Sequence, residues 1–439
     1  MDAGADDRRI VSIYPILLVN FVGTLGFSIV LPFLVYLVTK WGGNALIFGV
    51  MGAAYSAFQL IGAPILGRWS DVHGRRKILL LSQVGTLLSW VIFLWAFFLP
   101  PSPLLEVDSP ALGRFVVTLP LIVMFVARAA DGLTGGNVSV AHAYLADLSD
   151  DANRTANFGK MAVSANLGFI LGPALAGILG GTPLEELLPV VAALMISLAA
   201  TLIIVLKLPD SKNCVLESDP ETTSVRKIFG QEQTPCFEMR GAAKLSMAGI
   251  LRLPAVGRLM GIYFLVMLGF NFFYIGFPVH AVTGLRWSVT ETGIFFSVLS
   301  LLMVAVQGPV LGRLSKRFDE AALIAAGSLL LAASFLFFGV RTTPPVYAGV
   351  VLMAVGNGIM WPSVVSILAK AAGPRYQGAV QGFAGGSGSV ASIAGLLAGG
   401  VLYDGIGGKL FILSGGVILG VFLMSFGLPR TKPAAVRPA

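Results

Sequence analysis

LGRWSDVHGRRKILL, at residues 66–80, follows a long apolar run, and the sequence repeats it in altered form as LGRLSKRFDEAALI at residues 311–324. Paired segments that keep their order along a chain predict that one structural unit is present twice. Two more pairs follow the same order: DGLTGGNVS (131–139) with NGIMWPSVV (357–365), and LGPALAG (171–177) with IAGLLAG (393–399).

The composition is that of a membrane protein. Of 439 residues, 56% are hydrophobic and only 12% are charged, whereas soluble domains carry about 25% charged residues. The net charge of +8 is spread over the polar segments between apolar runs. We therefore expect a lipid bilayer, and no nucleic acid, as the partner of these basic residues.

Twelve apolar runs are long enough to cross a bilayer, which takes about 20 residues. A long polar stretch separates six runs from six and predicts an N-terminal six-helix bundle at 1–206, a cytoplasmic linker at 207–256 and a C-terminal six-helix bundle at 257–439. Residues 244–260 have the pattern of a basic amphipathic helix on the membrane surface. The expected spans are 11–39, 45–67, 78–100, 116–147, 157–180, 188–206, 257–283, 291–312, 319–340, 345–370, 377–403 and 408–428.

The basic residues predict the orientation in the membrane. With the N-terminus on the inner side, 24 Lys and Arg fall in inner segments and 5 in outer ones. Cytoplasmic segments carry this excess of positive charge, so both termini are expected in the cytoplasm of a multi-pass protein of the plasma or inner membrane. Six spans on each side of a long inner loop indicate a transporter with a cavity near mid-membrane, where the repeats meet.

GRWSDVHGRRK resembles the inner-loop motif of the major facilitator superfamily, with Gly67, Asp71, Gly74, Arg75 and Arg76 in place. Within that superfamily, three stretches are similar to the tetracycline-efflux-like branch of twelve-span drug:proton antiporters: GFSIVLP (26–32), ARAADGLTGGNVSVAHAYLADLSDDANR (127–154) and GFILGPALAG (168–177). The resemblance implies an all-α membrane protein with the major facilitator fold, in which 12 transmembrane helices form two bundles that alternate access to a central cavity.

The inner-loop motif combines a turn with charge. Gly67 and Gly74 permit a tight turn between helix ends, and Asp71 could meet a helix N-terminus or a neighbouring basic side chain. The resemblance implies a gate, because such a contact must break when the cytoplasmic mouth opens. The alternative is a basic loop that only fixes topology. The second copy of the motif carries Lys316 in place of Asp71.

The fifth expected span carries the glycines Gly168, Gly172 and Gly177, with Pro173 in its interior. Glycines at near-helical spacing allow close helix packing. The resemblance implies a pivot between the fifth and eighth helices that favours exchange over leak. Ordinary helix packing is the alternative.

Two charges stand inside the fourth expected span. Arg128 and Asp131 are three residues apart and can pair on one helix face, and His142 follows at nearly the same azimuth, nearer the cytoplasm. Intramembrane charges are mostly functional, so we expect a path for protons or substrate. A buried salt bridge that only fixes packing is the alternative for the pair, and a packing role is the alternative for His142.

Neutral polar and aromatic residues of the other spans supply the expected cavity lining, which suits amphipathic organic compounds. In the repeat, Ala354 and Asn357 stand where Arg128 and Asp131 stand, and the third span offers Ser82, Gln83 and Ser89 but no acid. The candidates are Asn20, Tyr55, Phe58, Gln59, Asn137, Asn271, Phe273, Tyr274, Gln307, Asn357, Trp361 and Phe383.

The leading hypothesis is proton-coupled export of small organic, drug-like molecules by a monomer. The resembling exporters carry a carboxylate three residues before their GFS sequence, where this chain has Gly23, so Asp131 is the only mid-membrane carboxylate available. One alternative is an uncoupled facilitator or importer of a sugar-like or anionic metabolite, with Arg128 as the anion contact. Another is a receptor or scaffold without flux. We expect no enzyme, cofactor or metal site, because the sequence shows no nucleophile–base pair, phosphate loop or clustered metal ligands.

Overall fold

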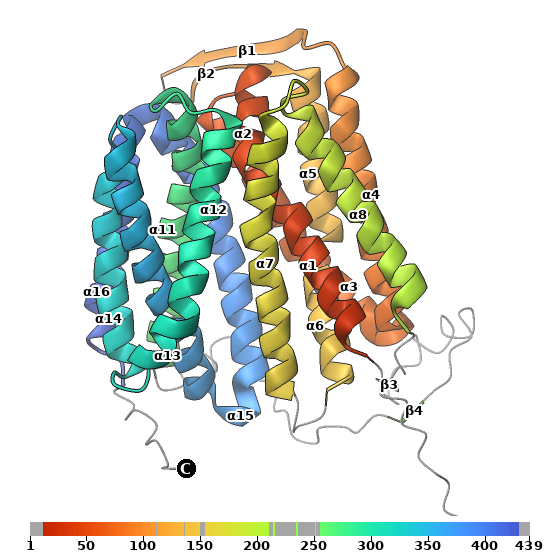
Figure 1. Ribbon diagram of the computed structural model, residues 1–439, viewed down its shortest axis with the longest axis vertical. Helices are drawn as coiled ribbons and strands as arrows, with labels where there is room; N and C mark the ends of the chain where they lie inside the picture. Colours follow the sequence, from red (N-terminus) through yellow and green to blue (C-terminus); the bar gives the residue numbers. More distant parts are fainter. Residues whose placement is uncertain are drawn as a thin grey trace, which may run out of the picture.

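A computed structural model describes residues 12–110, 112–135, 137–149, 154–209, 214–215, 234–235, 251 and 255–429. Long helices run roughly side by side, and a two-stranded hairpin lies across one end (Figure 1). The helices are α1 (Tyr14–Ser28), α2 (Val30–Lys40), α3 (Ala45–His73), α4 (Arg75–Trp95), α5 (Leu119–Thr134), α6 (Asn137–Asp147), α7 (Arg154–Gly180), α8 (Leu187–Lys207), α11 (Val256–Thr283), α12 (Val289–Ala305), α13 (Leu311–Leu314), α14 (Glu320–Ser334), α15 (Thr343–Ile406) and α16 (Leu410–Ser425). The strands are β1 (Pro103–Ser109), β2 (Gly113–Thr118), β3 (Cys214–Val215) and β4 (Thr234–Pro235).

Every expected span has a helical counterpart. Within the described residues, ten helical segments are long and apolar enough to cross a membrane, and the last of them, Phe383–Ser425, covers two expected spans. The first expected span is divided between α1 and α2 at Ile29. Pro32 explains the division, because its ring nitrogen cannot donate to the carbonyl of Ser28 one turn earlier.

The fourth expected span is not one helix, and here the prediction of a single run at 116–147 is wrong. Its first residues belong to β2, α5 ends at Thr134, and α6 begins at Asn137. Two adjacent glycines, 135 and 136, stand at the break, and glycine costs a helix interior about 1 kcal/mol relative to alanine. The azimuth calculated for His142 along one continuous helix therefore does not apply.

The tenth and eleventh expected spans are joined without a break in α15, whose backbone is helical for 64 residues. A straight helix of that length would extend about 96 Å. The backbones of Gly339 and Gly408, which flank α15, contact each other, so α15 crosses the molecule and returns. Its first arm packs on α14 and its second on α11 and α3, as the contacts of Gly356, Gly395 and Gly400 show.

The hairpin β1–β2 lies between the third and fourth expected spans. Its strands pair antiparallel, with Asp108 opposite Arg114, and the Val116 amide donates to the Gly42 carbonyl at 2.8 Å. We call this end of the molecule the hairpin end. Most of the expected surface helix at 244–260 lies outside the described residues, and its last residues, from Val256, form the start of α11.

The two halves pack against each other near the hairpin end. The Tyr36 hydroxyl donates to the Trp287 carbonyl at 2.7 Å. Across the α3–α15 interface, Asp404 accepts from the backbone amides of Ala45 and Leu46 at 3.3 and 3.1 Å. These amides belong to the first turn of α3, where a carboxylate is favoured by the helix dipole. The structure is therefore closed at the hairpin end.

Two glycines of α3 give a matched test of helix packing. A Cβ added at Gly62 would lie 2.0 Å from the Leu133 carbonyl of α5, whereas one added at Gly67 would meet no described atom within 4 Å. We expect Gly62→Ala to lower the melting temperature of the purified protein clearly, because backbone must move. Gly67→Ala should leave it equal or slightly higher, since alanine favours the helix. Equal losses in both variants would contradict this account of the α3–α5 contact.

Candidate functional site

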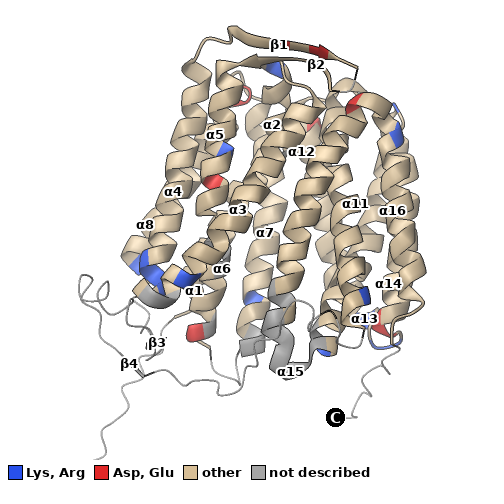
Figure 2. Ribbon diagram, turned by 180° about the vertical axis from the view of Figure 1, so that it is seen from behind, with Lys and Arg blue, Asp and Glu red and all other residues tan. Residues whose placement is uncertain are grey.

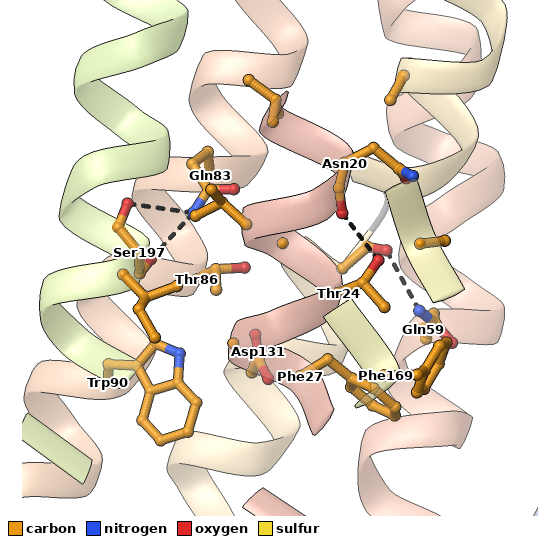
Figure 3. A pocket seen from close by; sticks show the side chains of 18 of the residues that line it. Asn20, Thr24, Phe27, Gln59, Gln83, Thr86, Trp90, Asp131, Phe169 and Ser197 are labelled. Atoms are coloured by element: carbon orange, nitrogen blue, oxygen red, sulfur yellow. Dashed lines mark hydrogen bonds between the residues drawn. The ribbon is translucent and has the colours of Figure 1, made fainter. Parts of the chain in front are cut away.

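A cavity of about 280 Å³ lies within the N-terminal half, among α1 and α3 to α8 (Figure 3). Its walls are mostly apolar, and among the described residues its only carboxylate belongs to Asp131. The lining comprises Val19, Asn20, Val22, Gly23, Thr24, Gly26, Phe27, Tyr55, Gln59, Gln83, Thr86, Trp90, Asp131, Gly135, Ala141, His142, Ala165, Phe169, Ile196 and Ser197.

The charges of α5 form a buried pair. Arg128 Nη1 lies 3.3 Å from Asp131 Oδ2, and the two side chains are 8% and 15% exposed. The Arg128 guanidinium also lies over the Tyr55 ring at 4.4 Å, which adds a cation–π contact. Figure 2 shows basic and acidic segments partway along α5, and Arg128 and Asp131 are the charged residues of that helix. Asp131 faces the cavity, whereas Arg128 is not among the residues that line it.

His142 reaches the same cavity from α6, across the break at Gly135. Its ring lies 6.0 Å from that of Phe158. The structure thus brings His142 and Asp131 to one cavity, although they do not share one helix as expected. Because α5 ends at Thr134 and α6 begins at Asn137, the periodicity of a single helix does not account for this arrangement.

Three of the expected cavity residues in the N-terminal half, Asn20, Tyr55 and Gln59, line the cavity. Asn20 Nδ2 donates to Ser164 Oγ at 2.8 Å, and Gln59 Nε2 donates to the Tyr55 hydroxyl at 3.2 Å. Phe58 is not part of the lining, and the side chain of Asn137 lies outside the described residues.

The expected residues of the C-terminal half do not line this cavity. Phe273 is fully buried in an aromatic cluster, where its ring lies 5.0 Å from that of Phe338. Asn271 donates to Ser392 Oγ at 3.0 Å. The others lie elsewhere in this half: Tyr274 against Phe296, Trp361 against Tyr263, Asn357 near the Met303 sulfur, Gln307 in the π-helical turn Val306–Val310, and Phe383 in α15.

The inner-loop motif lies at the end opposite the hairpin. Its arginines contact other helices of the N-terminal half. Gly74 joins α3 to α4 with a φ of +101°, a conformation that favours glycine. Arg75 contacts Asp147 at the end of α6 at 2.9 Å, and Arg76 donates to the Val205 carbonyl at 2.8 Å. The last carbonyls of a helix attract cations, so these arginines tie α3 and α4 to α6 and α8. The side chain of Asp71 lies outside the described residues.

The glycine motif of α7 serves two interfaces. Gly168 and Gly172 contact the backbone of α1, at Leu25 and Ile29. Pro173 and Gly177 instead contact Gly293 of α12, the eighth expected helix. The hydroxyl of Thr290 donates to the Gly177 carbonyl at 2.8 Å. Only the second part of the motif therefore lies where a pivot between the fifth and eighth helices is expected.

Several lining residues were not assigned to the cavity from the sequence, chiefly Phe27, Thr86, Trp90, Phe169 and Ser197. Gln83 is polar in the sequence, but its position there does not predict that it lines a cavity. Gln83, Thr86 and Trp90 stand at i, i+3 and i+7 and so share one face of α4. That spacing of polar groups in an apolar span is a signal that sequence reasoning could have used.

Two sets of membrane-length helices, with a mostly apolar cavity that holds a carboxylate within the N-terminal set, define a polytopic membrane transporter. The chain matches the Major Facilitator Superfamily over residues 16–307 and 259–439 and belongs to that family. The expected family resemblance and fold are thereby confirmed.

Relatives within the superfamily differ in the activities that their names give. The class C tetracycline resistance protein of Escherichia coli is 26% identical over 80% of this chain and 78% of its own length. Major facilitator superfamily domain-containing protein 10 of Bos taurus is 28% identical over 90% of this chain and 80% of its own. The crystal structure of the human organic anion transporter MFSD10 has a TM-score of 0.63 at 24% identity and covers 95% of this chain and 99% of that one.

Proposed function

We propose that this transporter exports small organic, drug-like molecules in exchange for protons, and that Asp131 takes up and releases the proton. The observation that carries the proposal is the buried Arg128–Asp131 pair, whose carboxylate faces a mostly apolar cavity. Resistance proteins among the relatives support efflux as the direction of transport.

Asp131 has two possible partners besides the proton, namely Arg128 and the substrate. As a carboxylate it is held by Arg128, and protonation removes its charge before the cavity closes through a dry intermediate. A substrate that interacts with the carboxylate competes with the proton for the same site. Such competition is sufficient for antiport, because one site serves both species in alternation.

The proposed orientation places both termini in the cytoplasm and the hairpin end outside. Contacts such as Tyr36 with Trp287 then close the outer side of the structure. The basic residues of the inner-loop motif lie at the opposite, cytoplasmic end. We propose that a monomer in the plasma or inner membrane performs this exchange.

Ethidium accumulation by proteoliposomes that are acidic inside tests the exchange. We expect the natural protein to accumulate ethidium only when the proton gradient is present, and Asp131→Asn to lose the gradient-dependent part by about tenfold or more, as for a group whose charge change is required. Glu106→Gln, in the exposed hairpin, is the matched control and should transport normally. Equal, gradient-independent uptake by the natural protein and Asp131→Asn would contradict antiport, as would no uptake by the natural protein.

A second candidate function is facilitated transport of an organic anion. The related human structure is named an organic anion transporter, and Arg128 Nε is buried without a hydrogen-bond partner among the described residues. On this alternative, Arg128 binds the anion and Asp131→Asn increases anion uptake, because the competing carboxylate is gone. Uptake of fluorescein with and without a gradient distinguishes the two candidates.

A further inference from the structure

The cavity extends past Asp131 to a second polar wall on α4 and α8. Figure 3 shows Gln83, Thr86, Trp90 and Ser197 on one side of Asp131, and Asn20, Thr24 and Gln59 on the other. The close contact of Gly85 with Thr134 brings α4 against α5 at this level. The Thr86 hydroxyl therefore lies beside the Asp131 carboxylate.

Gln83 presents an unused acceptor on this wall. Its side chain is only 1% exposed, and its Nε2 donates to Ser197 Oγ at 2.9 Å and to the Ser197 carbonyl at 3.4 Å. The carbonyl can only accept, so its proximity favours the orientation in which the amide nitrogen, and not the amide oxygen, faces Ser197. Gln83 Oε1 is buried without a hydrogen-bond partner among the described residues.

A buried acceptor without a donor is costly, by about 1–3 kcal/mol. Thr86 Oγ1 is likewise buried, and although its hydroxyl can donate to the adjacent Asp131 carboxylate, no donor among the described residues reaches its oxygen. Together with the Asp131 carboxylate, these atoms present acceptors to one lobe of the cavity. The missing partner is thus a group rich in donors, and its charge should be positive.

Aromatic rings stand on both sides of Asp131 (Figure 3). Trp90 stands one turn beyond Thr86 on the α4 wall, and on the opposite side Phe27 packs against Tyr55 and Phe169 with ring centroids 5.3 and 6.2 Å apart. Ring faces attract cations and accommodate a flat apolar body. A small aromatic amine combines both features.

We propose that Gln83, Thr86 and Asp131 form a subsite for the N–H donors of a protonated amine, with Trp90 beside its aromatic body. The subsite rests on the proposed function only in taking this cavity as the substrate site. The substrates expected at this subsite are small organic ammonium ions that retain N–H groups.

Equilibrium binding without a gradient tests the subsite. Phenethylamine and its N,N,N-trimethyl derivative share one aromatic body and one charge, but only the first has N–H donors. Calorimetric titration of the purified full-length protein at neutral pH should show phenethylamine binding about tenfold tighter, the range expected for a hydrogen bond to a charged group. Gln83→Met should reduce this preference by about threefold or more and leave the affinity for the quaternary amine within about twofold.

Two further variants keep the test decisive. Ser89→Ala removes a hydroxyl of α4 that donates to the Gly85 carbonyl of its own helix and does not line the cavity, and it should retain the preference. Thr86→Val keeps the side-chain shape and the Gln83–Ser197 contact, and should reduce the preference by about threefold even if Gln83→Met fails to fold. Equal affinity of the natural protein for both amines, no binding of either, or a preference that is undiminished in both Gln83→Met and Thr86→Val would overturn the subsite. Because no gradient is used, loss of proton coupling would not alter these results.

Discussion

Arg128→Met is expected to be the most damaging single change in the cavity region. It leaves the Asp131 carboxylate, 15% exposed, without the guanidinium 3.3 Å away. Removing one partner of a buried ion pair typically costs about 3–5 kcal/mol, because the remaining charge is uncompensated. We expect a large fall in the thermal stability of the purified protein, measured in detergent by tryptophan fluorescence.

The double variant Arg128→Met/Asp131→Asn distinguishes the effect of an uncompensated charge from the effect of lost side-chain packing. Replacing both members of a buried pair is often nearly neutral, so the double variant should regain stability to within about 1 kcal/mol of the natural protein. Its gradient-driven ethidium uptake should stay absent, because the proton-carrying group is missing. A double variant as unstable as Arg128→Met would show that Arg128 acts through packing, for example on Tyr55, and not through the carboxylate.

The same pair of variants addresses the alternative of a scaffold without flux. A scaffold needs the fold but not the two charges. A folded double variant would therefore function as the natural protein does if the protein were only a scaffold. Transport that is lost in a stable double variant excludes this alternative.

Much of the fold could be predicted from the sequence, because span length and charge bias act locally along the chain. The apolar runs and the basic turn at Arg75 and Arg76 are such local features. The division of the fourth span after Thr134 is harder to predict, since glycines are common inside membrane helices. The continuity of α15 depends on the packing of its two arms on other helices.

The cavity was predictable in part. Arg128 and Asp131 are conspicuous because charge in an apolar run is rare. Phe273 and Trp90 are both aromatic residues in apolar spans, yet Phe273 packs in the C-terminal core and Trp90 lines the cavity. Composition does not show which face of a helix meets which neighbour. Gln83 is polar in the sequence, but only its contact with Ser197 reveals the free acceptor.

The contact between α7 and α12 makes the strongest test of how the halves move. A Cβ at Gly293 would lie 2.6 Å from Gly177 Cα and 2.7 Å from the Pro173 carbonyl. Both are backbone atoms, so a side chain at Gly293 must push the two helices apart at the hairpin end. Overpacking of this kind costs about 1–3 kcal/mol, and the cost falls only on the state in which the hairpin end is closed.

Gly293→Val should therefore shift the population toward the state that is open at the hairpin end. Ala45, 2% exposed at the α3–α15 contact, reports on this opening when it is replaced by cysteine in a protein whose Cys214 and Cys236 are changed to serine. We expect its labelling by a water-soluble maleimide to become about tenfold faster, since each 1.4 kcal/mol changes a population about tenfold.

Gly416→Val is the matched control, because a Cβ at Gly416 meets no described atom within 4 Å and the same substitution there should not change labelling. An unchanged labelling rate in Gly293→Val, together with lowered thermal stability, would mean that the α7–α12 contact only holds the fold together. Faster labelling without loss of folding would make Pro173 and Gly177 part of the moving contact. In that case Gly168 and Gly172, which face α1, would stay together through the cycle as one rigid interface.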